Sequence, residues 1–260
     1  MTVLTRILIG VVAILGVWTV AFADQGDSPR GQREAVVQAL ASGDRFRVSE
    51  AIVALHRTPT LVHVESVRNA VVAALQREAT LEMERQADAE QGQAQVGGGD
   101  TIVIMELVKI VSALEGDDTL EVLLPHIASS ARAGRRVTEF GERAVLPLLR
   151  QYSEGKGTRN PSSVRMGSLL TLAMIRSRAP VSPDHEKRLA ETARQALATA
   201  DEAIIVGGVF LSVACGDPEL VQVVRQIAAG DFGTRQIDER FGAWVQNSAR
   251  RALATGGRPW

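Results

Sequence analysis

Residues 66–85 read SVRNAVVAALQREATLEMER, and apolar side chains recur in this stretch at the spacing of an α-helix. Positions three and four residues apart share one face of a helix. Here that face carries Val67, Ala70, Val71, Ala74, Leu75 and Ala79. The same spacing recurs along almost the whole chain, and no stretch alternates apolar with polar residues for long. We therefore predict an all-α fold.

The breaks between the apolar stretches carry ordinary helix start and stop residues. Asn160-Pro161, Ser182-Pro183 and Asp217-Pro218 each place a capping side chain before a proline at the first helical position. The spacing and the breaks together predict helices over 31–42, 45–57, 64–91, 101–115, 118–133, 137–153, 161–178, 184–199, 202–215, 217–229 and 236–254. Most connections are short, so we expect successive helices to lie antiparallel.

The C-terminal half adds a regular interval to this pattern. Apolar helices open near Val164, Ile204 and Val245, about 40 residues apart, which is the length of an α-solenoid repeat with two helices. We predict a helical segment with partial repeats over 24–96, a Gly-rich joint at 97–100, and a helical repeat region over 101–260. One such helix pair cannot bury its apolar face alone, so neighbouring pairs must pack against each other.

At these residues the chain resembles HEAT repeats. VRNAVVAAL at 67–75 is similar to the second helix of a HEAT repeat, and GERAVLPLL at 141–149 is similar to the first. The resemblance covers 137–254 well, 31–80 partly and 81–136 poorly. It implies a right-handed α-solenoid of antiparallel helix pairs with a scaffold or binding role, and it carries over no catalytic residues. The motifs are degenerate, so another helical repeat or an irregular bundle remains an alternative.

The N-terminus has the three-part layout of a secretory signal peptide. A short head with one positive charge, Arg6, precedes an apolar run from Ile7 to Ala23, and Ala21-Phe22-Ala23 forms a cleavage site before Asp24. We predict that residues 1–23 are a signal peptide and that the mature protein is periplasmic or secreted. In the alternative, residues 7–23 stay in place as a membrane anchor of a structural envelope protein.

Patterns typical of catalysis or metal binding are missing from the sequence. There is no His-Glu-x-x-His, Cys-x-x-Cys or phosphate-binding loop. The four histidines are widely separated, and we expect each to be a surface or cap residue: His56, His63, His126 and His185. The single cysteine, Cys215, is expected to be a buried apolar residue. We therefore predict a protein that is not an enzyme and has no cofactor. A hydrolase that brings His126, Glu139 and Asp184 together is the less favoured alternative.

Charge is distributed unevenly along a chain that is close to neutral overall. The 29 basic and 30 acidic residues give a formal net charge of −1, which does not support binding to nucleic acid. Residues 82–121 hold ten acids and two bases, whereas residues 130–180 hold ten bases and three acids. This contrast indicates either two solvated faces, or neighbours that attract each other across the stack. The other interpretation is a basic concave surface for an anionic partner, such as an acidic protein segment or an acidic envelope polymer.

The second interpretation gives a candidate partner-binding surface. Its residues are Arg132, Arg135, Arg136, Arg143, Arg150 and Arg159. The partner would be a protein of unknown identity, and a membrane would be involved only if the N-terminal helix is retained. Neutral carbohydrate is disfavoured because aromatic residues are few, and we expect Phe241 and Trp244 to lie in the core.

Overall fold

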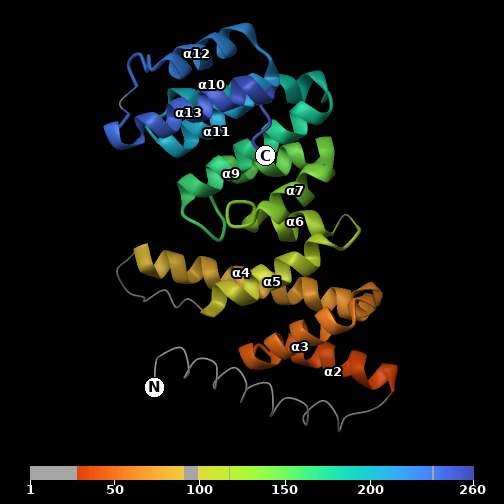
Figure 1. The fold of residues 1–260 in the computed structure, drawn as a ribbon. Helices are drawn as coiled ribbons and strands as arrows, with labels where there is room; N and C mark the ends of the chain where they lie inside the picture. Colours follow the sequence, from red (N-terminus) through yellow and green to blue (C-terminus); the bar gives the residue numbers. More distant parts are fainter. Residues whose placement is uncertain (1–27, 91–98, 117, 236) are drawn as a thin grey trace, which may run out of the picture. The chain divides into compact units, whose positions relative to one another are not determined.

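The computed structural model describes residues 28–90, 99–116, 118–235 and 237–260 (Figure 1). Within these residues the regular structure consists of twelve α-helices and three short 3-10 helices, with no strand. The all-α prediction is therefore confirmed. The predicted signal peptide lies outside the described residues. So do residues 97 and 98 of the predicted joint, whereas Gly99 and Asp100 belong to helix α5.

Contacts between residues divide the chain into two compact units, and the division falls inside one helix. The first unit ends at Ala74 and the second runs from Leu75 to Trp260. The N-terminal unit contains α2 (Pro29–Ala41), α3 (Arg45–Arg57), η1 (Pro59–His63) and the first turns of α4 (Glu65–Glu90). Helices α2 and α3 pack against each other as a hairpin. The Asp44 side chain begins α3 by accepting hydrogen bonds from the backbone of Phe46 and Arg47.

After the rest of α4, the C-terminal unit continues with a helix near its predicted position, α5, and then with a region in which two predicted helices are wrong. The elements of this part are α5 (Gly99–Ser112), α6 (Thr119–Leu123), η2 (Leu124–His126), α7 (Ala131–Glu139), η3 (Gly141–Ala144) and α8 (Val145–Glu154). Single helices over 118–133 and 137–153 are thus replaced by several short ones. Pro125 lies in the 3-10 turn η2 that ends α6, and Ser130 begins α7 as its cap. Gly141 then takes a positive φ of 58° between α7 and α8, a conformation that few other residues adopt.

The remaining helices begin and end within three residues of the predicted positions. They are α9 (Pro161–Arg178), α10 (Pro183–Ala198), α11 (Glu202–Cys215), α12 (Pro218–Ala229) and α13 (Glu239–Thr255). Asn160 and Asp217 cap α9 and α12 through their side chains, and a proline follows each of them. Ser182 precedes the proline of α10 without a side-chain cap bond.

Packing in the C-terminal unit follows a simple order (Figure 1). Helices α8 and α9, α10 and α11, and α12 and α13 contact each other as pairs. The second members of these pairs, α9, α11 and α13, also contact one another in turn, and the row extends further because α7 contacts both α9 and α5. Helix α11 has neighbours on most sides, so every residue from Ile204 to Ser212 is buried. Among the residues that the structure describes, no helix is long and apolar enough to cross a membrane.

Candidate interaction surface

The six arginines of the predicted surface all lie in the C-terminal unit, on four neighbouring segments of the chain. Helix α7 carries Arg132, Arg135 and Arg136, η3 carries Arg143, α8 carries Arg150, and the loop before α9 carries Arg159. All of them are exposed except Arg136, which is half-buried. The set is therefore mostly accessible, but it does not come from a single helix face.

Arg136 differs from its neighbour Arg135 because it is built into the fold. Its guanidinium donates a hydrogen bond of 2.8 Å to the backbone oxygen of Leu114 and pairs with Glu139. It also lies over the ring of Phe140, at 5.2 Å from the ring centre. These contacts join α7 to the segment that follows α5. Arg136 is consequently a structural residue rather than a contact for a partner.

Arg132 and Arg135 form the accessible basic stripe of α7. Both side chains are exposed, and within the described residues neither guanidinium is engaged by a hydrogen bond or an ion pair. The opposite face of the helix is buried through Ala133 and Val137. Helix α7 is therefore strongly amphipathic, with an apolar face towards the core and a basic face towards solvent.

Arg150 and Arg159 each line a hollow that also contains acidic residues. Arg150 lines a shallow hollow of about 310 Å³ together with Glu121 and Glu154. Arg159 lines a small cavity beside Glu82. Since positive charge that is not offset by nearby acids is what attracts an anionic partner, the basic stripe of α7 is the stronger part of the predicted surface.

Glu142, which precedes Arg143, ties η3 to the start of α10. Its carboxylate accepts hydrogen bonds from the backbone nitrogen of Ser182 at 2.8 Å and from Nδ1 of His185 at 2.7 Å. The hydrogen bonds from Ser182 and His185 lower the pKa of Glu142 to about 2. His185 lies in the first turn of α10, near the cap position that we predicted for it.

His126 is buried, so its prediction as a surface residue is wrong. Its side chain is fully enclosed, because η2 carries it under the loop that precedes α9. Nδ1 lies 3.4 Å from the hydroxyl oxygen of Thr158, which donates a hydrogen bond to the backbone oxygen of Pro125. Nε2 finds no hydrogen-bond partner in the described part of the chain. Burial lowers the pKa of His126 to about 4, so the ring is neutral at pH 7.

The hydrolase alternative requires His126 to meet Glu139 and Asp184. No hydrogen bond or ion pair among the described residues joins His126 to Glu139 or Asp184. Glu139 pairs with Arg136 instead, and Asp184 lies in the first turn of α10. The adjoining cavity is small, with a volume of about 30 Å³. Its lining residues are Glu82, Thr101, Ile104, Met105, Ser129, Thr158 and Arg159.

The polar groups around this cavity join three segments of the C-terminal unit. Gln86 of α4 donates to the backbone oxygen of Thr158 at 2.8 Å, and the hydroxyl oxygens of Thr158 and Ser129 are 3.2 Å apart. Glu82 pairs with Arg85. Buried polar groups that satisfy one another in this way fix the geometry of a core. The described residues contain no group of three or more side chains arranged to hold a metal ion.

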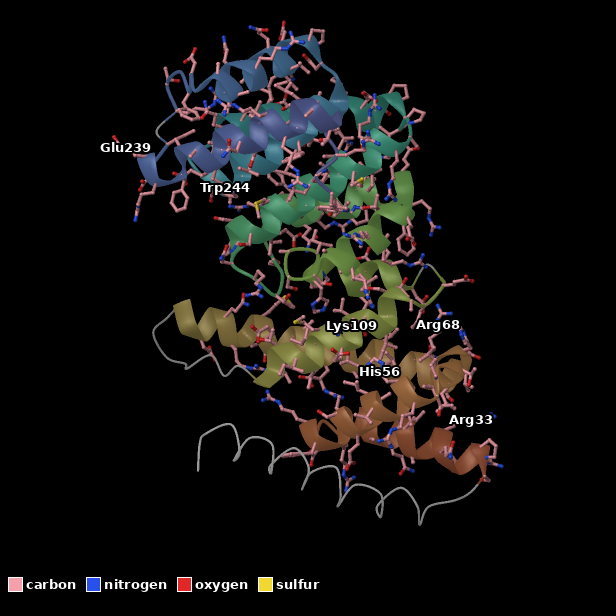
Figure 2. All side chains as sticks on the ribbon, viewed as in Figure 1. Arg33, His56, Arg68, Lys109, Glu239 and Trp244 are labelled. Carbon is pink, nitrogen blue, oxygen red and sulfur yellow. The ribbon has the colours of Figure 1, made fainter. Side chains whose placement is uncertain are left out.

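The aromatic pair on α13 is exposed, which corrects the prediction that it lies in the core. Phe241 and Trp244 are 43% and 41% exposed, and their rings meet edge to face with centres 6.3 Å apart. Figure 2 shows Trp244 near Glu239, at the end of α13 where the helix begins. The helix turns Val245 towards the core instead. A sequence period can identify an apolar face, but here the aromatic residues lie beside that face.

The last described residues return from α13 to the other helices (Figure 1). Residues 256–260, which we call the strap, bring Gly257 against Ala214 of α11 and the indole of Trp260 beside Gly134 of α7.

Cys215, at the end of α11, is half-buried, and burial raises the pKa of its thiol to about 12. The thiol is therefore protonated and unreactive at neutral pH.

Comparison of the chain with protein-family models, with curated proteins and with solved structures gives no match.

Proposed function

We propose that this protein is an exported helical-repeat scaffold that binds a protein partner and does not catalyse a reaction. Its architecture would be a right-handed α-solenoid of antiparallel helix pairs, similar to HEAT repeats. The observation that supports this is the row of contacts from α5 through α7, α9 and α11 to α13. In a solenoid each repeat contacts its neighbours in sequence order, whereas a single irregular core has no such order.

The interval between repeats gives further support to the same proposal. The second helices of the three pairs begin at Pro161, Glu202 and Glu239, about 40 residues apart as in two-helix repeats. Export would follow from the predicted signal peptide at residues 1–23. The mature chain would then act in the periplasm or outside the cell.

The partner surface that we propose is the basic stripe of Arg132 and Arg135 on α7, extended by Arg143 on η3. The exposed Arg132 and Arg135 favour an acidic segment of a partner protein, because complementary charge steers the encounter and fixes its register. The ten acids at 82–121 do not remove this charge by pairing with Arg132 or Arg135, since neither arginine has an ion pair within the described residues.

The test is affinity capture with the mature chain, residues 24–260, from a fractionated envelope extract of its source. The double variant Arg132→Glu/Arg135→Glu should lose a partner that the natural sequence retains, and higher salt should release that partner. The matched control is Arg178→Glu/Arg225→Glu, which reverses two exposed arginines on α9 and α12. If both double variants capture the same proteins as the natural sequence does, the stripe is not the binding surface.

A further inference from the structure

The strap, residues 256–260, crosses from the last helix to the α7–α9 contact. Two glycines turn the chain at the end of α13, with φ values of 62° for Gly256 and 81° for Gly257. Only glycine adopts such angles readily. A Cβ placed on Gly257 would lie 2.5 Å from the backbone nitrogen of Ala214. The strap is therefore in direct backbone contact with the end of α11.

The strap ends in an aromatic anchor. The indole of Trp260 packs beside Gly134 of α7: its Cζ2 and Cη2 lie 3.5 and 3.6 Å from the position that a Cβ of Gly134 would occupy, which is ordinary van der Waals contact. The hydroxyl of Thr171 on α9 lies 3.6 Å from the same position. The seat of Trp260 is thus formed jointly by α7 and α9. Gly134 is buried, while the indole itself remains 38% exposed.

Few interactions hold the strap in this seat. Pro259 is buried, and its backbone oxygen accepts a hydrogen bond of 2.8 Å from Arg251. Arg258 is exposed and donates only to Thr255 in its own turn. The strap is therefore held by the packing of Gly257, Pro259 and Trp260, and its hydrogen bonds all join it to α13. Five residues with such contacts are also a unit that can open locally.

We propose that the strap is an intramolecular ligand that covers a peptide-binding seat on α7 and α9. The seat accepts a short extended segment with a proline followed by an aromatic anchor, and the strap keeps it closed until a partner segment of this kind displaces Trp260. Gly134 lies on the buried face of α7 and Arg135 on its exposed face, so the seat and the basic stripe are separate surfaces of one helix. This inference rests on the proposed binding function, and it specifies where the apolar part of a partner would lie.

The test uses a fluorescein-labelled peptide of residues 254–260 and does not require the natural partner. The mature chain ending at Thr255 keeps all of α13 and should bind the peptide saturably. The chain with its strap should bind the peptide at least about tenfold more weakly. The reason is that a short tether keeps the strap near its seat at an effective concentration of about millimolar, where it competes with the peptide. The same peptide with Trp260→Ala should not bind. Fluorescence anisotropy measures each affinity, and circular dichroism checks that each chain is folded.

Two variants keep the inference open to contradiction. Trp260→Ala in the full mature chain frees the seat without shortening the protein, so it should restore peptide binding. Gly134→Met in the shortened chain fills the seat and should abolish binding, while the helix content stays the same. The proposal is overturned if folded chains without Trp260 ignore the peptide, or if removing the strap or Trp260 unfolds the protein. A dimer of the full chain that depends on concentration and on Trp260 would show that the strap binds a second copy, and would also overturn it.

These results separate the strap from the wider proposal. Loss of peptide binding in Gly134→Met with unchanged partner capture would leave the basic stripe in place as the binding surface. Loss of partner capture in Arg132→Glu/Arg135→Glu with unchanged peptide binding would support both. If the peptide does not bind and the partner is still captured, only the strap inference fails.

Discussion

Gly207 of α11 lies directly against Leu169 of α9. A Cβ placed on Gly207 would be 2.7 Å from the Cβ of Leu169 and 3.2 Å from the backbone oxygen of Met166. The adjacent Gly208 faces the other way, and a Cβ there would be 2.8 Å from the Cβ of Ala196 on α10. Two consecutive glycines thus let one helix approach two neighbours closely, which is why α11 is the most enclosed helix of the C-terminal unit.

Gly207→Ala should destabilise the C-terminal unit although alanine favours a helix. The added methyl group collides with the backbone and Cβ of α9, and overpacking of this kind costs about 1–3 kcal/mol. Gly242→Ala in α13 is the matched control, because its Cβ would be 3.8 Å from the nearest atom, in Phe232. The control should be neutral or stabilising by up to about 1 kcal/mol. Urea unfolding followed by circular dichroism measures both, and equal effects would contradict the close contact.

The sequence predicts the helices from α9 onward because their limits are local. Asn160-Pro161 and Asp217-Pro218 cap and begin helices in the way that their chemistry requires, whatever they pack against. The region of α6 to α8 is different. Its apolar residues continue at helical spacing across Pro125 and Gly141, so the period predicts two long helices where the backbone makes several short ones.

The sites are harder to predict than the fold, because burial and pairing depend on residues far away in the chain. His126 is enclosed through Thr158, 32 residues later, and Trp260 reaches Gly134 on a helix more than a hundred residues earlier. Arg135 and Arg136 are identical in type and adjacent in sequence. Only the position of the Leu114 carbonyl makes one of them structural. A pattern of charge can identify the basic region but not the arginines that remain available.

Burial of neutral His126 should make the protein lose stability in mild acid. The pKa of His126 falls from 6.5 to about 4 on folding because the charged ring is desolvated, so between these values the unfolded chain binds a proton and the folded chain does not. Stability is complete above pH 6.5 and declines as the pH falls towards 4, by a total on the order of 3 kcal/mol. The variant His126→Gln removes the titrating ring and with it this dependence of the stability on pH. Urea unfolding at pH 7.5, 5.5 and 4 should show a smaller decline for the variant, and parallel declines would contradict it.

Glu142 is an acid whose pKa is lowered on folding, so it should stabilise the protein at neutral pH and lose this effect in stronger acid than His126 does. Its pKa falls from 4.5 to about 2 because Ser182 and His185 donate hydrogen bonds to it, so its contribution is present above pH 4.5 and is lost as the pH falls through 2. Glu142→Gln should therefore lower the Tm at pH 7, with a difference from the natural sequence that shrinks between pH 4.5 and 2. Glu154→Gln, at an exposed position of α8, is the control. A difference in Tm that stays constant across this range would show that the carboxylate charge is not responsible.

The two adjacent arginines of α7 should separate stability from binding. Arg136→Gln removes the bond to the Leu114 carbonyl, the pair with Glu139 and the contact with Phe140. Because a hydrogen bond from a charged group contributes about 1.5–3 kcal/mol, the free energy of unfolding should fall by an amount in that range. Arg135→Gln removes an exposed side chain with no such bond and should change stability by less than about 0.5 kcal/mol. Urea unfolding measures both effects.

The same pair should behave in the reverse order when a partner is bound. Arg135→Gln should weaken capture, because its guanidinium faces solvent on the basic stripe, whereas Arg136→Gln should retain capture at temperatures where it is folded. If Arg136→Gln is as stable as the natural sequence, then its bonds to Leu114 and Glu139 do not hold α7 in place. If it is less stable and Arg135→Gln also loses stability to the same extent, both arginines belong to the fold. The accessible surface of α7 would then be reduced to Arg132.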